Sequence, residues 1–145
     1  MAPKVVASPI LVFVDDSPAF STAILEILRT KYEVAAAFAD GASALDKIPI
    51  LSPDIVILDI SLGDVDGFEV ARRLKRSNCS AKIIFLTMHE CTDFMNAAFD
   101  IGACGYVFKS RVTGDLTKAI DTVFRGGRFQ SPRSPMFDSR PGRSL

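Results

Sequence analysis

Acidic, hydroxyl and cationic side chains occur in this sequence directly after short apolar runs. They are Asp15-Asp16 after residues 10–14, Asp59 after residues 55–58, Thr87 after residues 83–86, and Lys109 after residues 106–108. If these runs are parallel strands of one sheet, three carboxylates, a hydroxyl and an ammonium group meet at one edge of that sheet. Together these groups could bind a divalent metal ion and handle a phosphoryl group.

The three carboxylates are the centre of this chemistry. They would repel one another unless a cation lies between them, and hard oxygen ligands suit Mg²⁺ or Mn²⁺. With such an ion bound, one carboxylate can attack phosphorus to form an acyl phosphate. Asp59 is the best candidate nucleophile because it follows the run expected to be the central strand. Asp15 and Asp16 then become metal ligands, while Thr87 and Lys109 contact phosphoryl oxygens.

The apolar runs alternate with helix-like patterns along the chain, which favours repeated βα units. We expect strands near 10–14, 33–38, 55–58, 82–87 and 104–108, and helices near 18–30, 40–48, 68–76, 92–101 and 113–125. The second helix should stop before Pro49, and Thr113 should cap the fifth. This pattern predicts an α/β domain with a doubly wound, mainly parallel sheet and helices on both faces.

Length and composition limit the function classes. A chain of 145 residues with 48% hydrophobic and 23% charged residues fits one compact domain. Its formal net charge of zero gives no general attraction to nucleic acid or to an anionic membrane. The first apolar run is too short for a signal peptide or a spanning helix, so a cytoplasmic protein is expected. The three cysteines form no CxxC pair that would suggest a zinc site.

Taken together, the motifs resemble a two-component response-regulator receiver domain over residues 8 to about 130. The matching segments are Val14-Asp15-Asp16, Leu58-Asp59, Asp66-Gly67, Leu86-Thr87 and Gly105-Tyr106-Val107-Phe108-Lys109. The resemblance implies a flavodoxin-like sheet of five strands in the order 2-1-3-4-5. Residues 86–89 and 119–127 are similar to the receiver subgroup that usually precedes a helix-turn-helix output domain. We therefore expect a receiver domain over 8–127 and a flexible tail, rich in Ser, Pro and Arg, over 128–145.

The resemblance also implies roles for residues around the phosphoacceptor. The backbone carbonyl of Ser61 would be a further metal ligand beside Asp15, Asp16 and the phosphoacceptor Asp59 itself. Thr87 and Tyr106 would form a switch, in which the hydroxyl moves toward the phosphoryl group and the aromatic ring turns inward. Ser61 and His89 would line the site and tune the rate of dephosphorylation. The chain departs from the family at Ser21, where Arg is common.

The implied function is a signalling switch that accepts a phosphoryl group on Asp59, with Mg²⁺, from a sensor histidine kinase or a histidine phosphotransfer protein. Phosphorylation would reshape the surface of the fourth helix, fifth strand and fifth helix, and a phosphorylation-dependent homodimer is expected. Such a protein assists its own phosphorylation and dephosphorylation but is not otherwise an enzyme.

Two alternatives remain at this point. One is a Mg²⁺-dependent phosphatase of the haloacid dehalogenase type, which also uses an Asp nucleophile. The DxD motif of that family is replaced here by Asp15-Asp16-Ser17. The other is the receiver fragment of a DNA-binding transcriptional regulator. Residues 128–145 carry no helical apolar pattern, so this chain itself is not expected to bind DNA.

Overall fold

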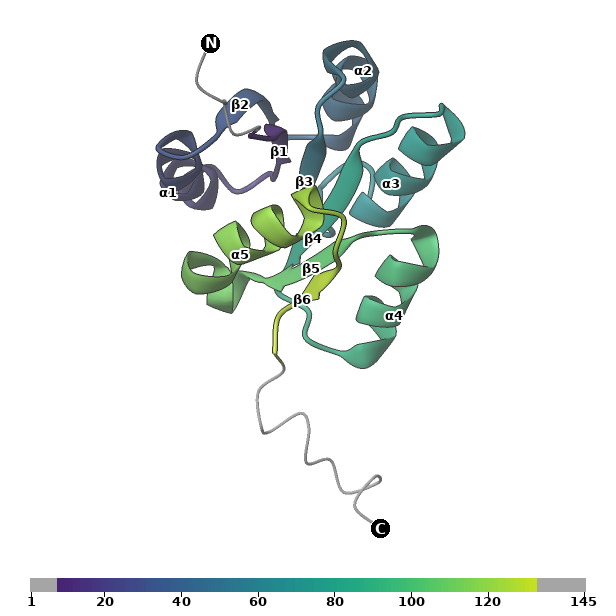
Figure 1. Cartoon of the computed structure of the whole chain (residues 1–145). Coiled ribbons are helices and arrows are strands. Elements are labelled where there is room, and N and C mark those ends of the chain that lie inside the picture. The colour runs from purple at the N-terminus through teal and green to yellow at the C-terminus, as the bar shows by residue number, and fades with distance from the viewer. Residues whose placement is uncertain (1–7, 133–145) are drawn as a thin grey trace.

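The computed structural model describes residues 8–132, in which strands and helices alternate as predicted (Figure 1). The strands are β1 (Ile10–Val14), β2 (Glu33–Phe38), β3 (Ile55–Asp59), β4 (Lys82–Thr87), β5 (Gly105–Phe108) and β6 (Phe129–Gln130). The helices are α1 (Pro18–Arg29), α2 (Gly41–Leu51), α3 (Gly67–Arg76), α4 (Thr92–Ile101) and α5 (Val112–Phe124), with a short 3₁₀ helix, η1 (Lys109–Arg111), before α5.

The strands form one parallel sheet in the order β2-β1-β3-β4-β5-β6. Helices α1 and α5 cover one face, and α2, α3 and α4 cover the other (Figure 1). The prediction of a doubly wound, flavodoxin-like sheet is confirmed. The predicted number of strands was wrong, since β6 adds a sixth strand beside β5. The chain leaves β1 in one direction and β3 in the other, so the strand order reverses between them.

The central strands are buried on both faces, which explains their continuous apolar runs. All five residues of β3 are buried, and so are the last five of β4. Their side chains alternate between two hydrophobic cores, one beneath α2, α3 and α4 and one beneath α1 and α5. These cores hold the strands in place, so the carboxyl ends of β1, β3, β4 and β5 open at one edge.

Two predicted helix boundaries were wrong. Helix α2 continues through Pro49 to Leu51. Proline has no backbone N–H, but near the end of the helix this costs only one hydrogen bond. The helix then stops at Ser52, which adopts a left-handed conformation with φ 48°. Helix α5 begins at Val112, so Thr113 is not its cap. The 3₁₀ helix η1 leads directly into α5 and provides the first turn without a side-chain cap.

Strand β6 lies in the segment predicted to be a tail. Phe129 N donates to the Cys104 carbonyl at 3.0 Å, and Ser131 N donates to the Tyr106 carbonyl at 2.9 Å. Two strand residues are too few to show an alternating pattern in the sequence, which explains why β6 was not predicted. Residues 133–145, the remainder of the predicted tail, lie outside the described residues. Among residues 8–132, the helices are all too short or too polar to cross a bilayer.

Candidate functional site

The structure brings the three predicted carboxylates together at the point where the strand order reverses. Asp15 and Asp16 follow β1, and Asp59 is the last residue of β3. One carboxylate oxygen from each residue lies within 4.8 Å of the other two. Asp15 and Asp59 are buried, with 2% and 3% of their surface exposed, whereas Asp16 is exposed. The cluster therefore has a buried floor and an open side.

Lys109, the first residue of η1, lies between the two buried carboxylates. Its Nζ is 2.8 Å from Asp15 Oδ2 and 3.3 Å from Asp59 Oδ2, and only 12% of its side chain is exposed. The ammonium group also lies 4.6 Å from the centre of the Phe20 ring, on α1. The Lys109 ammonium group, which follows β5, thus contacts a carboxylate directly after β1 and another at the end of β3.

Burial and charge shift the pKa values of the central pair. Burial raises the pKa of Asp59, and the nearby Asp15 carboxylate adds to this effect, while the Ser61 amide and Lys109 oppose it. For Lys109, burial acts to lower the pKa, but the two carboxylates outweigh it, and the pKa is raised. Lys109 therefore stays charged, while the ionised form of Asp59 is disfavoured by its surroundings.

The carboxylate cluster fits a divalent cation. Asp15 Oδ1 accepts from Ser17 N, and Asp59 Oδ1 accepts from Ser61 N. Asp15 Oδ2 is buried without a well-aligned hydrogen bond, although it lies in ion-pair contact with Lys109. The site has three carboxylates and only one ammonium group, so its negative charge is not balanced by side chains. Carboxylate oxygens are hard ligands that suit Mg²⁺ or Mn²⁺, and such an ion would balance this charge.

The hydroxyl and aromatic residues meet behind this cluster. Thr87 ends β4 and is fully buried, and its Oγ1 accepts a hydrogen bond from His89 N at 2.9 Å. Tyr106 is also fully buried, and its hydroxyl donates to the His89 carbonyl at 2.8 Å. Burial raises the pKa of Tyr106. The aromatic ring that the resemblance expects to turn inward is inward in this structure.

The loops after β3 and β4 touch above the carboxylates. Ser61 Oγ lies 3.4 Å from His89 Nε2, and the His89 ring packs against Phe94 of α4 with centroids 4.3 Å apart. The two residues expected to tune the rate therefore contact each other. Gly67, at the start of α3, approaches the β3 end so closely that a Cβ there would overlap the Asp59 carbonyl and lie 2.7 Å from Ile60 Cα.

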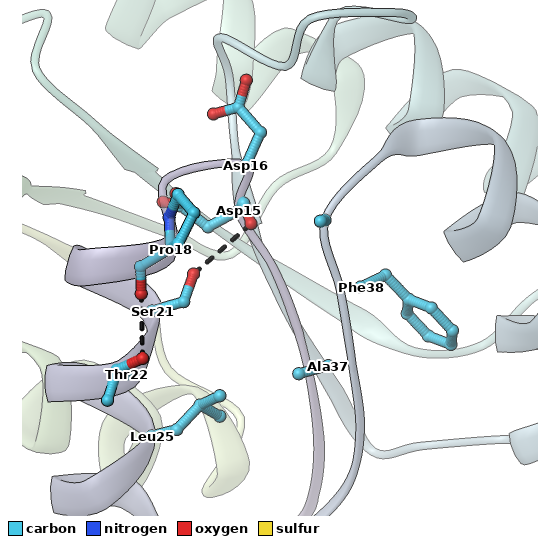
Figure 2. A pocket seen from close by; sticks show the side chains of 9 residues that line it. Asp15, Asp16, Pro18, Ser21, Thr22, Leu25, Ala37 and Phe38 are labelled. Atoms are coloured by element: carbon cyan, nitrogen blue, oxygen red, sulfur yellow. Dashed lines mark hydrogen bonds between the residues drawn. The ribbon is translucent and has the colours of Figure 1, made fainter.

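A cavity of about 240 Å³ lies between α1 and β2, beside the acidic pair (Figure 2). Asp15 and Asp16 lie at one end and Leu25 at the other. Ser21 lines it and donates to the Asp15 carbonyl at 3.4 Å. The short Ser21 side chain, at the position where the family often has Arg, leaves this side of the carboxylates open.

A link between the loop after β3 and helix α2 was not predicted from the sequence. Both carboxylate oxygens of Asp64 accept backbone N–H groups at the start of α2, from Gly41 at 2.9 Å and from Ala42 at 3.0 Å. Backbone amides that donate to this carboxylate, Gly41 first, then Val65 and Ala42, lower the pKa of Asp64 to about 2. An acidic residue in a loop gives no sign of which distant helix it caps, whereas Asp66 caps α3 locally through Glu69 N.

We expect Asp64→Ala to lower the stability of the protein at neutral pH, because α2 loses two bonds at its positive end. A carboxyl group with a lowered pKa stabilises the fold above its ordinary value of 3.8 and loses that effect as the pH falls toward 2. Urea unfolding of wild type and variant between pH 7 and pH 2 measures this. The difference between them should shrink with falling pH, and a constant difference would contradict the assignment.

The fold and the acidic sheet edge define a class of parallel α/β proteins with a carboxylate cluster at the strand-order reversal. Residues 10–121 match the family model described as the response regulator receiver domain. The chain belongs to this family, which favours the receiver interpretation over the phosphatase alternative.

Individual relatives agree with this membership. The nitrate/nitrite response regulator protein NarP of Escherichia coli (strain K12) is 32% identical over 125 residues, which cover 85% of this chain and 58% of NarP. A two-component response regulator of the LuxR family from Aurantimonas sp. SI85-9A1 superposes with a TM-score of 0.82 at 30% identity, covering 95% of this chain and 98% of that one. The isolated receiver domain of RcsB from Salmonella enterica serovar Typhimurium, with the phosphomimetic BeF₃⁻, gives 0.79 at 28% identity, covering 86% and 94%. The chain spans a little over half the length of the curated relatives it matches.

Proposed function

We propose that this chain is a phosphorylation-dependent signalling switch whose phosphoacceptor is Asp59. The observation that carries the proposal is the position of the Asp59 carboxylate, which is buried, 3.3 Å from Lys109 Nζ and within the acidic cluster. A buried carboxylate beside a fixed ammonium group is arranged to form and stabilise an acyl phosphate. Membership in the receiver family supports the same reaction.

The phosphoryl group would come from a phosphohistidine on a sensor kinase or a phosphotransfer protein. A carboxylate oxygen of Asp59 forms the new bond to phosphorus, the nitrogen–phosphorus bond breaks, and its electron pair stays on the imidazole. Lys109 pairs with one phosphoryl oxygen and the Thr87 hydroxyl donates to another. Asp15, Asp16, Asp59 and the Ser61 carbonyl would hold Mg²⁺, which would supply positive charge to the phosphoryl oxygens. Ser61 and His89 flank this region and set access for the water that later hydrolyses the acyl phosphate.

The switch works as a shift between two packings of one surface. Thr87 accepts from the His89 amide, and the Tyr106 hydroxyl donates to the His89 carbonyl. A Thr87 hydroxyl that moves toward the phosphoryl group therefore shifts His89 and the hydrogen bond that holds the Tyr106 ring. The surface of α4, β5 and α5 then differs between the two states. A second copy of the chain binds there in the phosphorylated state, in the cytoplasm. Sedimentation that finds the same monomer with and without the phosphoryl group would count against this dimer.

A second candidate is that the chain is the receiver part of a longer transcriptional regulator. It matches 53% of the transcriptional regulatory protein DegU of Brevibacillus brevis and 58% of AfsQ1 of Streptomyces coelicolor. The phosphorylated surface would then act on a domain beyond residue 145. Sequencing the reading frame after that residue tests this candidate.

Intact-mass measurement after incubation with Mg²⁺ and a small acyl-phosphate donor tests the proposed function. We expect one added phosphoryl group, its absence when EDTA replaces Mg²⁺, and its slow loss after the donor is removed. Steady release of inorganic phosphate from unrelated phosphoesters, with no adduct, would instead support a phosphatase.

Mg²⁺ is expected to stabilise the fold as well. An ion that binds only the folded chain adds about 2.7 kcal/mol of stability at a concentration 100 times its Kd. Thermal unfolding with and without Mg²⁺ measures the effect. Asp16→Asn is the matched variant, because Asp16 is exposed and its loss should weaken binding with little change in the metal-free midpoint. Equal Mg²⁺ stabilisation of both proteins would exclude Asp16 as a ligand.

A further inference from the structure

Outside the carboxylate cluster, one pair of buried polar side chains remains without a role. The buried polar or charged residues among those described are Asp15, Asp59, Thr87, Asp115 and Ser131. The first three belong to the proposed phosphoryl site. The other two contact each other, since Ser131 Oγ donates to Asp115 Oδ2 at 2.7 Å. Buried polar groups are costly unless they are fully bonded, so this contact calls for a reason.

The pair closes both ends of the turn that carries Lys109. At one end, Phe108 N donates to Ser131 Oγ at 3.1 Å. At the other end, Arg111 Nε donates to Asp115 Oδ2 at 3.0 Å, the same oxygen that accepts from Ser131. Lys109 and Ser110 thus lie between two residues that are linked to Asp115 Oδ2. Arg111 bonds to this oxygen directly, and Phe108 is linked to it through the Ser131 hydroxyl. We call Phe108, Arg111, Asp115 and Ser131 the Lys109 clamp.

Strand β6 delivers Ser131 to this clamp. The ladder to β5 ends with Ser131 N, which donates to the Tyr106 carbonyl at 2.9 Å. The strand pairing ends at Tyr106 and Gln130, and the next amide of this edge, Phe108 N, donates to the Ser131 hydroxyl. The guanidinium of Arg128 lies 3.8 Å from the centre of the Phe99 ring and fixes the start of the strand on α4. Ser131 is held from both its backbone and its side chain.

The clamp matters for chemistry because the Lys109 side chain is long and its backbone lies in a short 3₁₀ turn. That turn has no side-chain cap. The position of this 3₁₀ turn determines whether Lys109 Nζ can contact Asp15 and Asp59 at the same time. A displacement of a catalytic group by about 1 Å can slow a reaction by as much as about 100-fold. Residues that fix this turn therefore influence a reaction they do not touch.

We propose that Ser131, acting with Asp115, is a positioning residue that fixes the Lys109 turn and so sets the rate at which Asp59 accepts a phosphoryl group. The inference rests on the proposed function and extends it. The working receiver includes residues beyond α5, up to at least Ser131, and a change in the docking of β6 alters the phosphoryl site. If Ser131 had only a structural role, its loss would lower the stability of the fold, and its effect on the reaction would not depend on Lys109.

The test measures the rate of Asp59 phosphorylation by phosphoramidate with Mg²⁺ in the full chain, well below the unfolding midpoint. We expect Ser131→Ala to be about fivefold to tenfold slower than wild type, with Mg²⁺ affinity by calorimetry unchanged. Ser131→Thr keeps the hydroxyl and should stay within about twofold of wild type. Gln130→Ala is the matched control, because this exposed residue lies in the same strand and takes part in none of the hydrogen bonds that define the clamp.

A double-mutant cycle separates positioning from general stability. In a Lys109→Ala background, Ser131→Ala should have no further effect on the rate, because the group it positions is gone. An equal slowing in both backgrounds, or a wild-type rate for Ser131→Ala, would overturn the inference. If Ser131→Ala fails to fold, Arg111→Gln opens the exposed end of the clamp and should slow the reaction only when Lys109 is present. A wild-type protein that gains no phosphoryl group would instead remove the proposed function and, with it, this inference.

Discussion

Asp59→Asn is expected to gain no phosphoryl group under conditions that fully modify the wild type. The amide is not a nucleophile toward phosphorus at neutral pH, and no other described carboxylate is both buried and bridged to Asp15 by Lys109. Intact mass with Mg²⁺ and a small acyl-phosphate donor measures the outcome. An adduct of full yield in the variant would show that another residue is the acceptor.

The same substitution should make the metal-free protein more stable. The fold raises the pKa of Asp59, so the folded chain binds this proton more tightly than the unfolded chain. The ionised carboxylate then costs stability, and the cost grows as the pH rises from the ordinary Asp value through the raised one. Asn carries no charge and avoids that cost. Urea unfolding at pH 7 without metal should give a higher midpoint for the variant, and a lower midpoint would contradict the assigned direction of the pKa.

Much of the site could be predicted from the sequence because its residues stand at the carboxyl ends of strands or directly after them. An apolar run that ends in Asp59 or Thr87 gives both the strand and the location of its carboxyl end. In a parallel sheet those ends share one edge, so residues far apart in the chain are expected to meet. The apolar runs of the central strands are also long enough to be distinguished from loops, and their helices carry clear apolar stripes.

Other features depend on contacts that no local pattern encodes. Asp64 could cap any nearby helix, and only the assembled fold brings it to the start of α2 rather than α3. Ser131 lies in a segment rich in Ser, Pro and Arg, where composition predicts a tail, yet it is fully buried against Asp115. Strand β6 forms because β5 offers a free edge, which is a property of the sheet and not of residues 129–130.

Lys109→Ala should slow phosphorylation of Asp59 by about 100-fold, since removal of one fixed group that stabilises developing charge has an effect of this size. The Mg²⁺ ligands remain, so some activity should survive, in contrast to Asp59→Asn. The rate of adduct formation at saturating Mg²⁺, followed by intact mass, measures the loss. Lys118→Ala, an exposed lysine on α5, is the matched control and should react at the wild-type rate. A Lys109→Ala rate equal to wild type would show that the bridging ammonium has no part in the reaction.

The stability of Lys109→Ala should depend on metal in a way that reveals what the lysine does. Without Mg²⁺, the variant leaves the buried carboxylates of Asp15 and Asp59 facing each other with no cation between them. Breaking a buried ion pair from one side costs about 3 kcal/mol. Added Mg²⁺ would return positive charge to the same oxygens, so it should stabilise the variant more than the wild type. Unfolding midpoints with and without Mg²⁺ measure the two differences. An equal Mg²⁺ effect in both proteins would mean that Lys109 and the metal do not act on the same carboxylates.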